Sequence, residues 1–274
     1  MLLEAKMHTP TVLTIAGFDP YGGAGIVLDT KVIHHLGAYG LSAISAMTAQ
    51  NSKGVTYSSA IDAQELRVQL ETLLDDIKID ALKIGMLSSA SNIEVVSDII
   101  DRYSIKNIVL DPIIKSSSGK VLLDDKALEV MIKKLFPKVT LLTPNLPEIN
   151  HILGSSYQGE VDEIPQIAKA FFGKLVDAVL IKGGHSTQKD EAIDYLVTNN
   201  LGATKFKTKR VQTTHTHGTG CFLSSAIATN LAFGKPLTQS IQEAKELLYQ
   251  RLYLASNIQL NYHDKTCDRR EMLM

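Results

Sequence analysis

Of the 274 residues, 45% are hydrophobic and 21% are charged, which is the composition of an ordinary globular protein with enough apolar residues to bury a core. The 28 Lys and Arg residues balance 29 Asp and Glu residues, and the net charge of -1 excludes a strong overall attraction to nucleic acid and favours a small-molecule partner. Two cysteines, Cys221 and Cys267, are too few for a disulfide framework, and no apolar run is long enough to cross a bilayer, so the sequence predicts a cytoplasmic protein.

The N-terminal part of the chain has the pattern of a strand, a glycine-rich loop and a helix. Residues 11–16 are a β-branched apolar run that predicts a buried parallel strand, and the loop of residues 17–25 leads into a helical pattern that stops at Gly37. The glycine spacing is not that of a dinucleotide-binding loop. Asp29, one turn into the helix, can accept a hydrogen bond from a ligand, or it can be a solvated acid favoured by the helix dipole.

Strands and helices alternate through the rest of the chain. The predicted strands are residues 41–49, 80–84, 105–110, 139–142 and 178–181, with a meander at 192–197 and 205–209. The predicted helices are residues 62–76, 92–103, 124–135, 165–175, 222–233 and 237–260. This alternation predicts an α/β fold with a single doubly wound, mostly parallel sheet flanked by helices. We expect one domain over residues 1–274, with a flexible segment at 1–8 and a polar tail at 261–274.

Polar or glycine-rich segments follow the predicted strands at their carboxyl ends, where open parallel sheets bind ligands. Gln50 ends one strand, Met86 follows the next and Asp111 the one after it. Glu148 lies where a carboxylate can serve Mg²⁺ beside phosphates, or can act only as an acid at the start of a helix. Lys182 precedes two glycines, a pattern that suits the binding of a phosphate group. A methionine such as Met86, taken alone, is more often a core residue than a ligand contact.

The segment His217-Gly-Thr-Gly-Cys221 opens a late helix. Gly218 and Gly220 let the backbone approach a ligand, and the free N–H groups of the first helical turn form an anion site. The helix dipole favours the thiolate of Cys221, which could then take a proton from a substrate hydroxyl. The alternative is a glycine-rich connector before a packed helix, with Cys221 an inert buried residue.

Eight motifs in this order give the chain a resemblance to a known family. They are TIAGFDPYGGAGI (14–26), LGAYG (36–40), AQN (49–51), KIGML (83–87), LDP (110–112), TPNLPE (143–148), KGGH (182–185) and HGTGC (217–221). Over roughly residues 11 to 255, the chain resembles the hydroxymethylpyrimidine/phosphomethylpyrimidine kinases of thiamin synthesis, in the ribokinase-like superfamily. Taken together, the motifs argue against the inert connector.

The resemblance implies transfer of the ATP γ-phosphate, with Mg²⁺, to 4-amino-5-hydroxymethyl-2-methylpyrimidine and then to its monophosphate. It implies that Cys221 is the base and that residues 218–220 form the anion hole. The implied substrate-binding residues are Gly17, Ala24, Asp29, Gln50, Met86 and Ile113. The implied nucleotide-binding residues are Lys182, Thr216, Gly218 and Gly220, the implied metal-binding residues are Asp111 and Glu148, and the catalytic set also includes Thr219. Relatives are often homodimers.

Some positions depart from the family pattern, and two other functions stay open. Lys115 stands where an apolar residue is usual, and Thr214 and His215 replace a common Lys-Asn pair. A pyridoxal kinase is the nearest alternative, because some enzymes with this cysteine motif phosphorylate pyridoxal. A vitamer-binding protein without catalysis is the alternative from another class. A sugar kinase fits less well, since that branch typically carries Asp where Cys221 stands.

Overall fold

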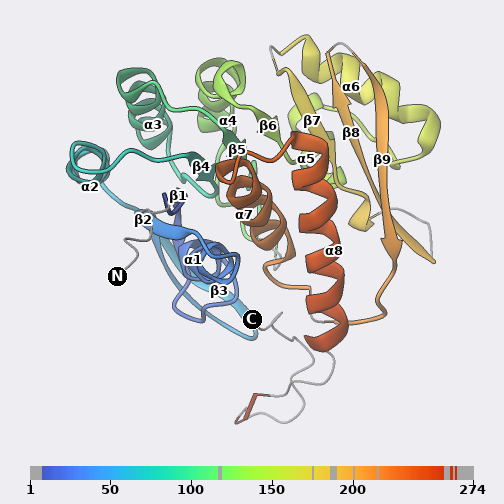
Figure 1. Ribbon diagram of the computed structural model, residues 1–274, viewed down its shortest axis with the longest axis horizontal. Helices are drawn as coiled ribbons and strands as arrows, with labels where there is room; N and C mark the ends of the chain where they lie inside the picture. The colour runs from blue at the N-terminus through green and yellow to red at the C-terminus, as the bar shows by residue number, and fades with distance from the viewer. Residues whose placement is uncertain are drawn as a thin grey trace, which may run out of the picture.

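The computed structural model describes residues 8–116, 119–174, 176–185, 190–199, 201–214, 216–255, 260–261 and 263. Within this part of the chain, nine strands form one sheet in the order β3-β2-β1-β4-β5-β6-β7-β8-β9 (Figure 1). The strands are β1 Thr11–Phe18, β2 Tyr39–Asn51, β3 Gly54–Ala60, β4 Ala81–Ile84, β5 Ile108–Leu110, β6 Leu141–Leu142, β7 Ala178–Ile181, β8 Glu191–Thr198 and β9 Leu201–Lys209. Neighbours from β2 to β7 in this order are parallel, whereas β3, β8 and β9 pair antiparallel at the two edges.

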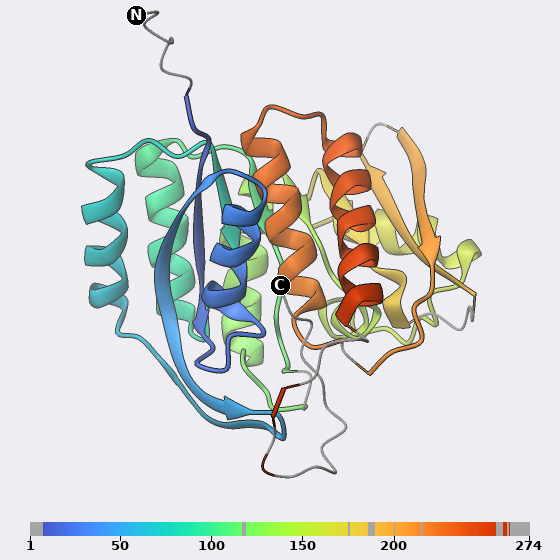
Figure 2. The ribbon, with the colours of Figure 1, turned by 60° about the horizontal axis from the view of Figure 1, so that its bottom comes forward.

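Helices cover both faces of the sheet. The helices α1 (Gly25–His35), α7 (Thr219–Ala232) and α8 (Leu237–Ala255) lie side by side on one face (Figure 2). The other face carries α2 (Ala63–Leu74), α3 (Ala90–Tyr103), α4 (Asp125–Lys134), α5 (Leu146–Leu153) and α6 (Ile164–Phe172). Each face has its own apolar core, one built around α7 and the other around α3 and α4. The molecule is therefore a three-layer α/β structure.

The side-chain alternation of β1 explains the two cores. Seven consecutive residues of this strand are buried, because both of its faces are covered. Leu13 and Ile15 pack into the core with α2 and α3, whereas Val12 packs into the core with α1 and α7. Thr14 faces the same side as Val12, which places its hydroxyl between the sheet and α1.

The predicted order of strands and helices is confirmed, with a few differences at the ends of elements. The structure adds β3, an edge strand whose residues are mostly half-buried or exposed, so its sequence lacks an apolar run. The strand predicted at 105–110 begins only at Ile108, because Asn107 has a left-handed φ of 54°. The helix predicted to reach residue 260 is confirmed as far as Ala255, and residues 256–259 lie outside the described ones.

Several expectations concern residues outside the described ones. These are most of the segment 1–8, most of the tail 261–274 with Cys267, and two residues of the loop after Lys115. All nine described strands share one sheet, and the assignment of the whole chain to one domain stays a prediction. Among the described residues, no helix combines the length and the apolar character needed to span a membrane.

Candidate active site

A cavity of about 760 Å³ opens at the carboxyl edge of the parallel strands. Its size is in the range of small-molecule sites. Most of its walls come from the ends of β1 and β2, from the segments that follow β1, β4, β5, β6 and β7, and from the start of α7. Of the predicted site residues, those that line it are Gly17, Ala24, Gln50, Met86, Asp111, Ile113, Glu148, Lys182, Thr216, Gly218, Thr219, Gly220 and Cys221. The structure thus brings together residues that are far apart in sequence, and the role of each stays a prediction.

The N-terminus of α7 forms one wall of this cavity. Gly218 is the residue before the helix and has a left-handed φ of +83°, and a Cβ there would lie 1.8 Å from the carbonyl oxygen of Gly23. Only glycine fits this close approach. The Thr219 hydroxyl donates to the carbonyl of Thr216 at 3.0 Å, which closes the turn before the helix. The first N–H groups of α7 are therefore presented to the cavity as an anion site.

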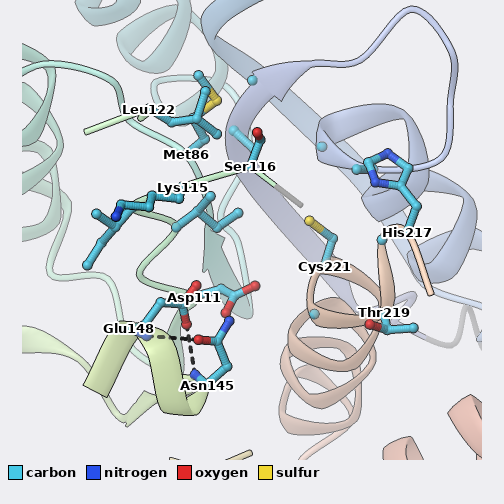
Figure 3. Close-up of a pocket in the computed structure, with 18 of the residues that line it drawn as sticks. Met86, Asp111, Lys115, Ser116, Leu122, Asn145, Glu148, His217, Thr219 and Cys221 are labelled. Atoms are coloured by element: carbon cyan, nitrogen blue, oxygen red, sulfur yellow. Dashed lines mark hydrogen bonds between the residues drawn. The ribbon is translucent and has the colours of Figure 1, made fainter. Parts of the chain in front are cut away.

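Cys221 lies in the first turn of α7, and its sulfur points into the cavity (Figure 3). Met86 and Leu122 lie on one side of the space in front of it, and Asp111 and Glu148 lie on another. The expectation that the thiolate is favoured here is wrong. Burial raises the pKa of the Cys221 thiol to about 11, although the Lys83 ammonium lowers it. The thiol is therefore almost wholly protonated at neutral pH.

Opposite α7, an ion pair joins the ends of two strands. Lys182, after β7, donates to Oδ1 of Asp111, after β5, at 2.7 Å, and the Thr143 hydroxyl donates to the same oxygen at 3.1 Å. A Cβ on Gly220 would lie 3.1 Å from Oδ2 of Asp111 and 3.3 Å from Nζ of Lys182. Burial alone lowers the pKa of Lys182, but the carboxylates beside it more than offset this and raise the pKa above its ordinary value. The ammonium is therefore firmly charged next to the anion site.

Of the two roles that its sequence position allowed, Glu148 is confirmed as an acid at the start of a helix, and a role with Mg²⁺ stays a prediction. It forms a capping box at the start of α5, accepting from the N–H of Asn145 at 2.8 Å while Asn145 accepts from the N–H of Glu148 at 2.9 Å (Figure 3). Its carboxyl group also lines the cavity. Burial raises its pKa to about 7, with Lys182 lowering it and Asp111 raising it further. The site therefore disfavours a negative charge on Glu148 in addition to the one on Asp111.

The donor set around Asp111 and Glu148 fits a magnesium nucleotide. The described residues contain no group of three or more His, Cys, Asp or Glu side chains able to hold a metal ion. Mg²⁺ however binds commonly through one or two carboxylates, with phosphate oxygens and water completing its shell. Both carboxylates line the cavity, and a bound cation would favour the ionised form of Glu148, whose pKa is raised by burial and by Asp111.

The prediction that Asp29 binds substrate is wrong, because its side chain is wholly buried and does not line the cavity. Its carboxylate accepts from the Thr14 hydroxyl at 2.7 Å, from the Lys83 ammonium at 2.7 Å and from the Ser225 hydroxyl at 2.8 Å. These partners come from β1, β4 and α7, so Asp29 ties α1 to the sheet and to the neighbouring helix. The alternative of a solvated acid is also wrong. Lys83, a charged residue inside a buried strand, was the signal that an internal counter-ion was required.

Asp19 and His217 both line the cavity, although neither is among the predicted site residues. Their side chains are 3% and 10% exposed, and Oδ2 of Asp19 lies 3.5 Å from Nε2 of His217. Asp19 also accepts hydrogen bonds from three backbone N–H groups of its own loop. In the sequence, an Asp that precedes a Pro and glycines looks like an ordinary turn residue. Only its position beside the loop that contains His217 identifies Asp19 as a candidate functional residue.

Comparisons with known proteins are consistent with this geometry. A sequence model of the phosphomethylpyrimidine kinases matches residues 19–266. The chain belongs to this family. It is similar to the hydroxymethylpyrimidine/phosphomethylpyrimidine kinase of Escherichia coli (strain K12), with 38% identity over 93% of this chain and 96% of the relative.

Solved structures show the same fold. The phosphomethylpyrimidine kinase of Clostridium difficile 630 has a TM-score of 0.77 and 36% identity, covering 88% of this chain and 99% of the other. The pyridoxal kinase of Staphylococcus aureus in complex with AMP-PCP has a TM-score of 0.84 and 28% identity, covering 94% and 92%. The predicted ribokinase-like fold is confirmed, and the protein is a kinase of this family.

Proposed function

We propose that the protein transfers the γ-phosphate of ATP to the hydroxymethyl group of 4-amino-5-hydroxymethyl-2-methylpyrimidine, and then phosphorylates the monophosphate, as a step of thiamin biosynthesis. The observation that carries this proposal is the single cavity in which Cys221 and the N-terminus of α7 face Lys182, Asp111 and Glu148. An anion site and a charged lysine next to a small-molecule pocket suit phosphoryl transfer, which requires mostly positioning and charge neutralisation.

The phosphate side of the cavity is built from fixed positive groups. The N–H groups of Gly218, Thr219 and Gly220 would bind oxygens of the transferred phosphoryl group, and Lys182 would contact the nucleotide phosphates. Asp111 and Glu148 would hold Mg²⁺, which when bound neutralises charge on the phosphate oxygens. Thr216 lies next to this wall, where it would contact the nucleotide.

The acceptor side is more apolar and holds a flat ring. Met86 and Ile113 would cover the faces of the heterocycle, and Gly17 and Ala24 would close around its edge. The amide of Gln50 would pair with the ring edge, because an amide supplies both a donor and an acceptor. This arrangement leaves the hydroxymethyl group of the acceptor directed to the start of α7.

Cys221 would accept the hydroxyl proton late in the transfer. A phosphoryl group passes through a loose transition state, so the hydroxyl becomes acidic only as its bond to phosphorus forms. Because burial raises the pKa of the thiol to about 11, only a small fraction is ionised at neutral pH. Once ionised, the thiolate is a strong proton acceptor.

A pyridoxal kinase is the second candidate, since a structure of that name shares the fold of this chain. The relative at 38% identity favours the pyrimidine. Side-by-side measurement of kcat/KM on the pyrimidine alcohol and on pyridoxal tests the choice, with the pyrimidine expected to react faster. Faster turnover of pyridoxal would reverse the assignment. Binding of either alcohol without any turnover of Mg-ATP would instead favour a vitamer-binding protein.

Two further expectations belong to this proposal. The need for ATP and a reduced Cys221 supports a cytoplasmic location. A homodimer is the expected assembly, and light scattering of the purified protein would test it.

A further inference from the structure

Asp19 fixes the shape of the glycine-rich loop after β1. One carboxylate oxygen accepts a hydrogen bond from the N–H of Tyr21 at 2.8 Å. The other oxygen accepts from the N–H of Gly23 at 3.1 Å and from the N–H of Ala24 at 2.9 Å. Ala24 is the residue before α1 and lines the acceptor side of the cavity. A single carboxylate therefore holds the turn against which the acceptor would lie.

The same carboxylate also contacts the loop that precedes α7. Oδ2 of Asp19 lies 3.5 Å from Nε2 of His217, and both side chains are nearly buried. His217 turns away from the cavity centre toward the first loop, whereas Cys221 points into the cavity (Figure 3). The two backbones touch as well, since a Cβ on Gly218 would lie 1.8 Å from the carbonyl oxygen of Gly23. Asp19 is therefore located where the two loops meet.

A third element, the end of β2, places Gln50 near enough to this carboxylate to affect its pKa. Burial alone raises the pKa of Asp19, but the neighbouring His217, the N–H of Tyr21 and Gln50 more than offset burial and lower the pKa below its ordinary value. The group is therefore an anion at neutral pH, and both of its oxygens act only as acceptors. Asp19 thus contacts residues on the acceptor side and on the phosphate side at once.

We propose that Asp19 is a positioning residue that sets the distance between the acceptor hydroxyl and the phosphoryl group. Ala24 and Gln50 belong to the acceptor side, and His217 and Gly218 belong to the loop of the anion site. Phosphoryl transfer needs the two reacting atoms in line, and a displacement of about 1 Å can cost about 10²-fold in rate. Because Asp19 holds the loop on the acceptor side through its hydrogen bonds and contacts His217 on the phosphate side, its loss should affect turnover more than the binding of either substrate.

The variant Asp19→Asn tests this role. Asparagine keeps the volume but replaces one acceptor oxygen by an N–H group, which then faces other donors. We expect kcat to fall about 10²-fold, with the KM for ATP and the thermal midpoint close to wild type. The matched control is Asp80→Asn. Asp80 also accepts from a backbone N–H, that of Thr11 at 2.8 Å, and lies 3.0 Å from Nε2 of His8, but it does not line the cavity. Its replacement should leave kcat unchanged.

A double-mutant cycle with His217→Gln separates the pair from two independent effects. If Asp19 acts through His217, the double variant should lose no more kcat than the more damaged single variant. Additive losses, or an Asp19→Asn kcat equal to that of the wild type, would overturn the positioning role. If Asp19→Asn does not fold, His217→Gln tests the same contact from the other residue. An unchanged kcat of His217→Gln would then overturn the positioning role. The positioning role rests on the proposed transfer, so turnover of the wild-type protein is measured first. An inactive wild type would count against the proposed function. An active wild type whose kcat is unchanged by Asp19→Asn would count only against the role of Asp19.

Discussion

The buried ion pair between Lys83 and Asp29 is the contact whose loss should cost the most stability. Both side chains are 0% exposed, and Nζ lies 2.7 Å from Oδ2. Replacing Lys83 by methionine keeps most of the side-chain volume but removes the ammonium, so that Asp29 keeps the hydroxyls of Thr14 and Ser225 as its side-chain partners among the described residues. Removing one partner of a buried pair leaves an uncompensated charge and typically costs about 3–5 kcal/mol. We expect the free energy of unfolding to fall by this amount.

Thermal or urea unfolding at neutral pH measures this loss. For a chain of this size, each kcal/mol corresponds to about 2–4 °C, so Tm should fall by roughly 6–20 °C. Burial alone lowers the pKa of Lys83, but Asp29 more than offsets it and raises the pKa above the ordinary 10.5. A raised folded pKa means that the contribution is complete below 10.5 and is lost as the pH rises through the folded value. Neutral pH therefore samples the whole effect.

Two variants control the measurement. The double variant Lys83→Met with Asp29→Asn removes both charges and should recover much of the lost stability, since no buried charge stays unpaired. Lys207→Met breaks an exposed pair, in which Nζ lies 3.0 Å from Glu191 and the side chains are 62% and 40% exposed, and should cost less than about 1 kcal/mol. If Lys83→Met cost no more than Lys207→Met, or if the double variant lost the sum of both single variants, the assignment of a buried charge pair would be refuted.

Three further predictions concern turnover. Cys221→Ala should keep affinity for the alcohol but lower kcat by roughly a hundredfold or more. Because burial raises the thiol pKa to about 11, kcat of the wild type should rise with pH above neutrality, and kcat of the variant should not. Identical pH profiles of the two proteins would remove the thiol from the mechanism. Lys182→Met removes the ammonium beside Asp111 and should raise the KM for ATP about 10- to 100-fold in steady-state assays, and an unchanged KM would place the nucleotide phosphates elsewhere. Gly218→Ala would put a Cβ 1.8 Å from a backbone oxygen and should lower kcat about 10²-fold. The control Gly234→Ala, also at positive φ but in open space, should leave kcat unchanged. Equal kcat values for the two variants would contradict the close approach at Gly218.

The fold could be predicted from hydrophobic patterns because most of its strands are buried on both faces. Runs such as Ala178–Ile181 are apolar throughout and are bounded by polar or glycine residues, so their limits are visible in the sequence. The start of the helix predicted at 62–76 is confirmed as well, since Asp62 caps α2 by accepting from the N–H of Gln64 at 2.8 Å. β3 was missed because an edge strand packs little apolar surface, so that its sequence resembles a loop.

The location of the site could also be predicted, because parallel strands end at one edge and the motifs follow those ends. The direction in which a helical side chain points could not. Asp29 is one turn into α1, and whether it faces the cavity or the sheet depends on Lys83, which is 54 residues away in the chain. Asp19 was missed for the same reason, since its contact with His217 joins two loops from opposite ends of the sequence.

The surroundings of Cys221 contain opposing charges, which explains why its position alone gave the wrong protonation state. The helix N-terminus and the Lys83 ammonium favour the thiolate, but burial, together with Asp29 and Asp111, favours the neutral thiol and outweighs them. A thiol that resists ionisation is a poor nucleophile toward other reagents at rest, yet its anion is a strong base. If a phosphoryl group forms its bond to the acceptor oxygen before the proton leaves, the acidity of that hydroxyl rises sharply during the reaction, and the proton moves downhill to an ionised thiol. The pKa that makes Cys221 inert in the resting protein is then the same property that makes its thiolate an effective base in the transfer.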